Sequence, residues 1–150
     1  MKPSNPVQDK LIKILREKFK DIPGDYKIPP PVFVAMKGEV IEFDFNSGYL
    51  KIKFPVLDNH MNPFGNMQGG MIAAAIDNTL GPLSMAVAPP NFTRHFEIKY
   101  RRAIPLKTGH LYVAGNFEGQ KKQQLFFGAT VVDGKGNEYA TAKSVHWIIE

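Results

Sequence analysis

Apolar residues near the N-terminus recur at the spacing of one face of an α-helix. Charged side chains separate the apolar positions Val7, Leu11, Leu15 and Phe19. The pattern predicts a surface helix from about Pro6 to Phe19, whose apolar stripe covers the protein core rather than a membrane. A proline-rich connector is expected over residues 21–31, and together with Val32, Phe33 and Met36 it is expected to wrap the domain edge or line a ligand entrance.

From residue 38 the apolar positions follow a period of two, which is typical of β-strands. Turn-forming stretches divide this pattern, and Asn46, Ser47 and Gly48 form a hairpin turn between the first two strands. The expected strands are residues 40–45, 50–54, 92–102, 109–118, 123–133 and 138–149.

A helix is expected between the second and third strands. Met71 to Ile76 carries no polar side chain, and a helix that is apolar on every side is a buried helix. Pro82 should kink this helix or limit it to about Ala88. Two strands, one long apolar helix and four further strands predict an α+β fold, in which an antiparallel sheet wraps around the helix.

One carboxylate, Asp77, interrupts the apolar helix. A carboxylate in apolar surroundings lowers the stability of the fold unless it is paired, so an unpaired one indicates a functional role. Those surroundings should also raise its pKa. Two interpretations are open: a general base, or a structural aspartate held by backbone amides. The helix is expected to begin at Gly69 and Gly70, where the lack of side chains leaves backbone N–H groups approachable. Alternatively, these glycines allow close helix–sheet packing.

With 150 residues, 43% of them apolar, the chain is expected to form one domain with a sizeable core. Cysteine is absent, which excludes disulfides and a thiol nucleophile, and the histidines lack metal-ligand spacing. The net charge of +5 favours solubility and suits an anionic ligand, but no nucleic-acid-binding motif accompanies it. Without a signal-peptide pattern or a membrane-spanning run, a cytoplasmic location is expected.

The central stretch resembles a motif of hotdog-fold acyl-CoA thioesterases, in the phenylacetate-degradation (PaaI-like) family. That motif is N-x-x-G-x-x-H-G-G with an aspartate seven residues later, and here it reads Asn62, Gly65, Gln68, Gly69, Gly70 and Asp77. Every spacing is kept, and the resemblance extends from about Phe43 to the C-terminus through the order of the strands. Gln68 departs from the family's histidine, and glutamine forms hydrogen bonds but does not titrate.

The resemblance implies one hotdog thioesterase domain over residues 1–150, with residues 1–31 as an N-terminal helix and connector. It implies that Asp77 activates water, while the Gly69 N–H and the Asn62 amide polarise the thioester carbonyl. Gln68 would lie near the acyl group, and a hydroxyl at Thr93 would help to orient the water. Considered without the motif, Asn62 is a loop cap and Thr93 an ordinary strand residue.

Substrate-binding residues are expected in two groups. The densest basic run is expected to hold CoA phosphates, or else to form a solvated strand face, and it comprises Arg94, Lys99, Arg101 and Arg102. The second group would form an acyl pocket beside Gly70, or else plain core, and it comprises Phe64, Met67, Met71, Met85 and Phe96.

The leading expectation is an acyl-CoA thioesterase that releases a carboxylic acid and free CoA, with no metal and no cofactor other than the CoA of its substrate. The alternatives are a non-catalytic acyl-CoA binding hotdog protein, which Gln68 favours, and a hotdog hydratase or dehydratase, whose histidine-centred motif is missing. Gly69 and Asp77 lie roughly 12 Å apart along one helix, so the site is expected to be shared in a homodimer or a dimer of dimers. Neither nucleic acid nor a membrane is an expected partner.

Overall fold

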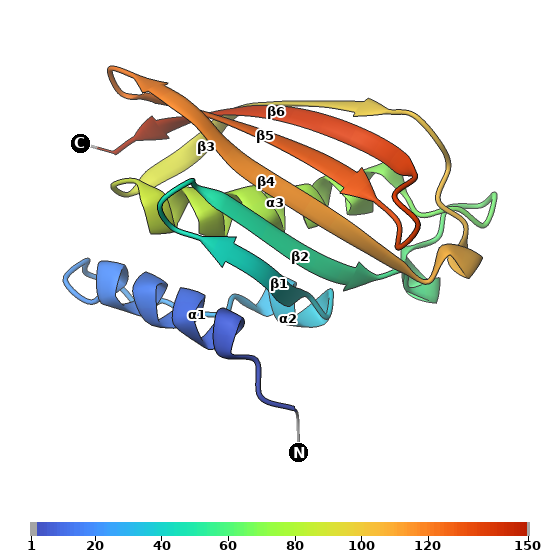
Figure 1. Ribbon diagram of the computed structural model, residues 1–150, viewed down its shortest axis with the longest axis horizontal. Helices are drawn as coiled ribbons and strands as arrows, with labels where there is room; N and C mark the ends of the chain where they lie inside the picture. Colours follow the sequence, from blue (N-terminus) through green and yellow to red (C-terminus); the bar gives the residue numbers. More distant parts are fainter. Residues whose placement is uncertain (1–2, 150) are drawn as a thin grey trace.

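The computed structural model describes residues 3–149 of the chain. Within that range, six antiparallel strands form one sheet in the order β1-β2-β4-β5-β6-β3. Figure 1 shows this sheet curling over the long helix α3 (Gly69–Val87). The strands are β1 Glu39–Asp44, β2 Tyr49–Pro55, β3 Asn91–Tyr100, β4 His110–Lys121, β5 Gln124–Val132 and β6 Glu138–Ile148. The predicted sheet wrapped around a helix is confirmed.

Contact between α3 and the sheet forms the centre of the core. Ile76, Leu80 and Leu83 of α3 are buried in one apolar cluster with strand residues such as Phe127. Removing this apolar surface from water is the main favourable contribution to folding. Gly115 on β4 allows the close approach, because a Cβ at that position would lie 2.7 Å from Leu80 Cδ2.

The expectation that α3 is buried on every side does not hold within the single chain. The sheet covers the helix face that carries Ile72, Ile76 and Leu80, whereas Gly70 and Asp77 are exposed on another face. A single curved sheet surrounds only part of a helix, and the small apolar residues of α3 do not require burial on the remaining side. The helix therefore has one buried face and one open face in this chain.

The N-terminal helix α1 (Pro6–Phe19) has the predicted bounds and lies against β1 and α3. Two hydrogen bonds tie its start to the outer edge of β1. Asn5 Nδ2 donates to the Val40 carbonyl at 3.0 Å, and the Val40 N–H donates to Gln8 Oε1 at 3.1 Å. At the other end of α1, Lys18 Nζ donates to the Ala88 carbonyl at 2.8 Å, which caps the C-terminus of α3.

A short helix that the pattern did not predict, α2 (Pro31–Ala35), follows the connector. Proline suits the first position of a helix, and five residues are too few to show a helical period. Phe33 and Met36 are buried, so this segment wraps the edge of the domain, which is one of the two expectations stated for it.

The two edges of the sheet differ. The edge at β1 carries the hydrogen bonds from α1, whereas β3 has no further strand beside it within residues 3–149, and most of its ten residues are exposed. An uncovered edge strand presents a row of unpaired backbone groups to any other strand.

No helix in the described range is long and apolar enough to cross a membrane.

Candidate functional site

The motif begins in a tight loop between β2 and α3. Asn62 Oδ1 accepts hydrogen bonds from the N–H groups of Phe64 (3.0 Å) and Asn66 (3.1 Å), and Gly65 supplies the positive φ of +78°. The interpretation of Asn62 as a loop cap is therefore correct for its side-chain oxygen. Its Nδ2 group has no acceptor among the described residues, so the cap orients an amide donor that stays available.

The loop leads into the first turn of α3, where the Gln68 N–H donates to the His60 carbonyl at 2.8 Å. Gln68 is the N-cap residue, but its side chain makes no cap hydrogen bond. The N–H groups of Gly69 and Gly70 also lack an acceptor in the part of the chain that the structure describes. Two unpaired donors thus lie at the positive end of a 19-residue helix, which suits an anion.

Close packing does not explain the glycine pair. A Cβ added at Gly70 would meet no atom within 4 Å, and one added at Gly69 would lie 3.5 Å from the Tyr100 ring, which is an ordinary contact. The space above Gly70 is therefore open in this chain. Gly70 lies on the same open face as Asp77, because seven residues correspond to two helical turns.

Asp77 has no hydrogen bond or ion pair with any described residue. Loss of water around its carboxyl raises the pKa of Asp77 above the ordinary value. Its exposure in the single chain acts against this shift: water reaches the carboxylate from the open side, while protein atoms crowd the other side. The structural interpretation of Asp77 required backbone amides as partners, and no such contact is present among residues 3–149.

Asp77 and the first turn of α3 do not converge within one chain. Gly69 and Asp77 are eight residues apart on one helix, and at about 1.5 Å per residue the separation is roughly 12 Å along the axis. One thioester carbonyl cannot lie within hydrogen-bond distance of both. A single chain therefore carries the two parts of the candidate site at separate places.

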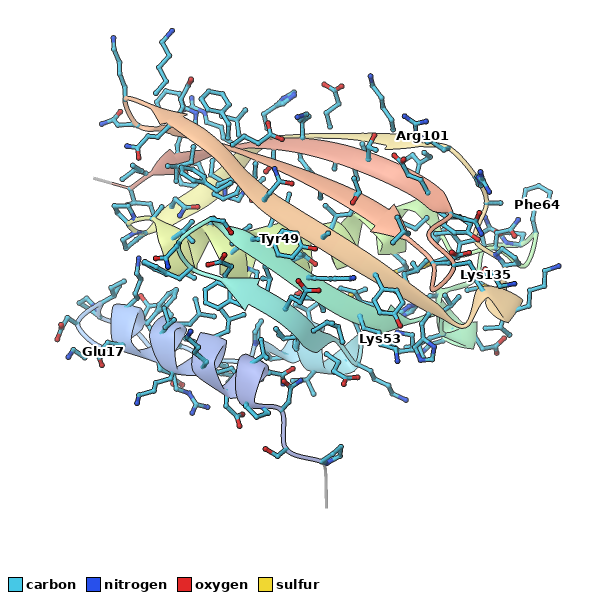
Figure 2. The ribbon with its side chains drawn as sticks, viewed as in Figure 1. Glu17, Tyr49, Lys53, Phe64, Arg101 and Lys135 are labelled. Atoms are coloured by element: carbon cyan, nitrogen blue, oxygen red, sulfur yellow. The ribbon has the colours of Figure 1, made fainter. Side chains whose placement is uncertain are left out.

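The residues expected to form an acyl pocket differ in their exposure in this chain. Phe64, at the tip of its loop, is 88% exposed and points away from the ribbon (Figure 2), whereas Met67 is buried in the core. Met71, Met85 and Phe96 are partly buried against that core. Phe64 thus lines no pocket in the single chain, because its loop has no neighbour at the tip.

Side chains on β3 point to both faces of the sheet. Thr93 pairs with the buried residue His146, so the Thr93 side chain is on the face that covers α3. Lys99 pairs with Thr141, which alternates with buried neighbours, so the Lys99 side chain is on the outer face.

The basic residues around β3 do not form one cluster. Arg94 lies near the start of the strand, where its guanidinium carbon is 4.2 Å from the centre of the Trp147 ring. Arg101 follows the end of the strand, seven residues later, and about 3.3 Å per residue places the two arginines roughly 23 Å apart. Arg101 and Arg102 are exposed at the end of β3 that adjoins the start of α3, with Arg101 Nε 3.5 Å from Glu138 Oε1.

Tyr100, the last residue of β3, lies at this site although the sequence pattern did not indicate it. The Tyr100 hydroxyl donates a hydrogen bond to the Gly69 carbonyl oxygen at 2.8 Å, across 31 positions of the chain. A single tyrosine beside basic strand residues carries no local signal of such a contact.

No group of three His, Cys, Asp or Glu side chains that could hold a metal ion is found in residues 3–149.

Solved structures of other proteins share this fold. The Escherichia coli PaaI protein from the phenylacetic acid degradation operon matches with a TM-score of 0.77, at 14% identity over 96% of each chain. A Streptococcus mutans protein bound to acetyl-CoA matches with a TM-score of 0.69, at 21% identity over 75% of this chain and 88% of that chain. A hypothetical thioesterase from Streptococcus pneumoniae with coenzyme A also matches with a TM-score of 0.69, at 18% identity over 75% of this chain and 85% of that chain.

These likenesses confirm the predicted hotdog fold, and they agree with the resemblance to PaaI-like proteins that the motif indicates. A comparison with protein-family models finds no match, and a comparison with curated protein sequences finds none either.

Proposed function

We propose that this protein is an acyl-CoA thioesterase, which hydrolyses a thioester to a carboxylic acid and free CoA. The observation that carries the proposal is a set of unpartnered groups along α3: two N–H donors at its start and the Asp77 carboxylate two turns later. The Streptococcus structures with acetyl-CoA and CoA support a CoA compound as a ligand of this fold.

In the proposed reaction, Asp77 removes a proton from water while the water oxygen attacks the thioester carbonyl carbon. Negative charge develops on the carbonyl oxygen, which accepts hydrogen bonds from the Gly69 N–H and from Asn62 Nδ2. The C–S bond then breaks, the CoA sulfur leaves and takes the proton from Asp77, and the carboxylic acid remains. Thr93 orients the water, and Gln68 contacts the acyl group.

The proposal includes a homodimer, alone or within a dimer of dimers, because one chain separates Gly69 from Asp77. If two α3 helices pack antiparallel, Gly69 of one chain faces Asp77 of the other. The two-fold axis then passes near Ala73, where small side chains permit close approach. Pairing between two uncovered β3 strands would hold the helices in this arrangement.

Arg101 and Arg102 are the proposed contacts for CoA phosphates. Both are exposed and follow Tyr100, whose hydroxyl is bonded to the first turn of α3, so they lie near the proposed oxyanion donors. Arginine binds phosphate oxygens well because its planar group donates two parallel hydrogen bonds. Arg94 is less suited to this role, because its guanidinium stacks on the Trp147 ring.

A non-catalytic acyl-CoA binding protein is the second candidate, and Gln68 is the observation that favours it. Glutamine in place of the motif histidine keeps a hydrogen-bonding group but removes one that titrates. The two candidates share a ligand and differ in whether the thioester bond is broken.

Thiol release from short, medium, long and aromatic acyl-CoA esters separates the candidates. We expect the wild-type protein to release CoA, and Asp77→Asn to lower turnover by about 10²-fold or more while acyl-CoA binding, measured by calorimetry, is retained. Asp9→Asn, which changes an exposed carboxylate on α1, is the control and should keep wild-type turnover. Wild-type binding without turnover would establish the non-catalytic candidate, and full turnover in Asp77→Asn would exclude Asp77 as the base.

A further inference from the structure

Tyr100 lies where the end of β3 meets the first turn of α3. Its hydroxyl donates to the Gly69 carbonyl oxygen at 2.8 Å, and its ring is 3.5 Å from the point that a Gly69 Cβ would occupy. From this geometry we infer that Tyr100 is a positioning residue, which holds the backbone N–H donors of the oxyanion site in place. The inference rests on the proposed thioesterase function and adds a residue that lies outside the motif.

Backbone hydrogen bonds hold the start of α3 at Gln68, whose N–H donates to His60 and whose carbonyl accepts from Met71 and Ile72, but no side-chain cap supports it. Glycine has more conformational freedom than any other residue, and here two glycines occur in succession. The N-cap residue Gln68 contributes no side-chain hydrogen bond, although such a bond commonly stabilises a helix start. The Asn62 side chain caps the loop before Gln68, whereas among the described residues the Tyr100 hydroxyl is the side-chain group that bonds to the first turn of α3.

The Tyr100 hydrogen bond acts on the peptide unit between Gly69 and Gly70. This unit is planar and trans, so its carbonyl oxygen and its N–H point in opposite directions. Holding the Gly69 oxygen therefore fixes the direction of the Gly70 N–H and anchors the residue whose own N–H is the proposed oxyanion donor. A small displacement matters, because such donors act at about 2.7–3.1 Å from the charged oxygen.

Tyr100 is itself well placed to act as an anchor. It pairs with the buried residue Ala140 on β6, so its side chain is on the face of the sheet that covers α3. Burial raises the pKa of the Tyr100 phenol, which keeps the hydroxyl proton available for donation to higher pH. Tyr100 is 51% exposed, and its hydroxyl contact with Gly69 links the end of β3 to the start of α3.

Tyr100→Phe removes only the hydroxyl and tests the inference. We expect kcat to fall about tenfold with KM within about twofold of the wild-type value, because the lost bond supports donors used in the transition state. Tyr26→Phe is the matched control. The Tyr26 hydroxyl also donates to a backbone carbonyl, that of Pro23 at 2.9 Å, and Tyr26 is 42% exposed on the connector far from the motif in the chain. This control should keep wild-type kinetics.

A second measurement does not depend on turnover. NMR relaxation order parameters of the Gly69 and Gly70 amides should fall in Tyr100→Phe, from about 0.85, typical of rigid backbone, towards about 0.6. The amides of β5 should not change, and Tyr26→Phe should show no change at either glycine. A variant with wild-type kcat, with unchanged glycine order parameters, or with a loss confined to KM would overturn the positioning role.

The outcomes separate this inference from the proposed function. If the wild-type protein hydrolyses no acyl-CoA ester, the proposed function fails, and the positioning role fails with it. If the wild-type protein is active and depends on Asp77, but Tyr100→Phe is equally active, only the inference about Tyr100 fails.

Discussion

The Asp77 carboxyl makes the pH dependence of the proposed reaction predictable. Only the ionised carboxylate accepts a proton, and its pKa is raised above the ordinary 3.8 by loss of water. Activity should therefore decrease as the pH falls through a pKa higher than that of a free aspartate. A profile of kcat/KM for the wild-type protein should show this acidic limb, and Asp77→Asn should lack it. An identical limb in the variant would assign it to a different group.

His146 is a buried histidine whose network links β6, β3 and the end of α3. Asn91 Nδ2 donates to the carbonyls of Ser84 (3.2 Å) and Pro89 (2.9 Å), so Asn91 Oδ1 is the atom that faces the ring. His146 Nδ1 therefore donates to Asn91 Oδ1 at 2.9 Å, and Nε2 accepts from the Ser144 hydroxyl at 3.0 Å. The ring is 1% exposed and both nitrogens are satisfied in the neutral form.

This network predicts a loss of stability in mild acid. Burial lowers the pKa of His146 to about 4 from 6.5, so between these values the unfolded chain binds a proton that the folded chain does not. The free energy of unfolding should thus fall as the pH decreases from 6.5 to 4, by about 3 kcal/mol for the full shift. Urea denaturation across this range should show a smaller decrease for His146→Gln, whose amide can still form hydrogen bonds but does not titrate. Equal pH dependence in both proteins would contradict the assignment.

At the residue scale, the sequence indicated groups that stand out against their neighbours. Asp77 was identifiable because it is the only charged residue in α3, and the glycine pair because of its motif spacing. Tyr100 and His146 gave no such signal, since their partners are distant in sequence and only the completed sheet brings them together. The two roles of Asn62, as a cap and as an available donor, were separable only when the contacts of its oxygen were known.

The packing of α3 on β4 depends on the absence of a side chain at Gly115. A Cβ there would lie 2.7 Å from Leu80 Cδ2 and 3.4 Å from Thr79 Cγ2, and both residues are buried. Gly115→Ala should therefore destabilise the fold by about 1–3 kcal/mol, the usual cost of overpacking a core. Gly81→Ala is the control for stability, because a Cβ on the open face of α3 meets no atom within 4 Å. Thermal unfolding that ranks Gly115→Ala at or above Gly81→Ala would contradict the tight helix–sheet contact.

Elements with a clear period were predictable, and short or one-sided ones were not. The apolar stripe of α1 gave its bounds correctly, since amphipathic spacing over 14 residues is a strong signal. The five residues of α2 contain no such period. In α3, the alanines within residues 71–76 were interpreted as buried apolar positions, but small residues are equally compatible with an open face, so the sequence pattern alone could not identify the covered side.

The shared-site proposal makes a prediction about the whole assembly. Asp77→Asn and Asn62→Ala should each be weakly active alone. In a mixed dimer, one site combines the intact Asn62 of one chain with the intact Asp77 of the other, and the second site has neither. Random pairing therefore restores about a quarter of all sites. Thiol release after co-expression or co-refolding measures this recovery.

Exchange between the variants must be shown independently, for example with two affinity tags. Heterodimers that form without any recovered activity would place both residues in a site within one chain.

Assembly was the scale least accessible to sequence analysis. The roughly 12 Å between Gly69 and Asp77 is the reason for proposing a second chain, and the small residues at positions 73–75 indicated contact between two helices, but no residue pattern indicated which strand edges would pair.

The unequal edges of the sheet also limit how many copies of this chain can join edge to edge. Pairing of two β3 strands uses the uncovered edge of each copy and leaves β1 at both outer ends, where Asn5 and Gln8 already hold the strand. In the proposed dimer, these contacts at Val40 would oppose further strand pairing at β1 and so would disfavour growth into a fibre. In the proposed assembly α1 would thus protect the outer edge of β1, and a chain lacking α1 would expose a second unpaired strand edge.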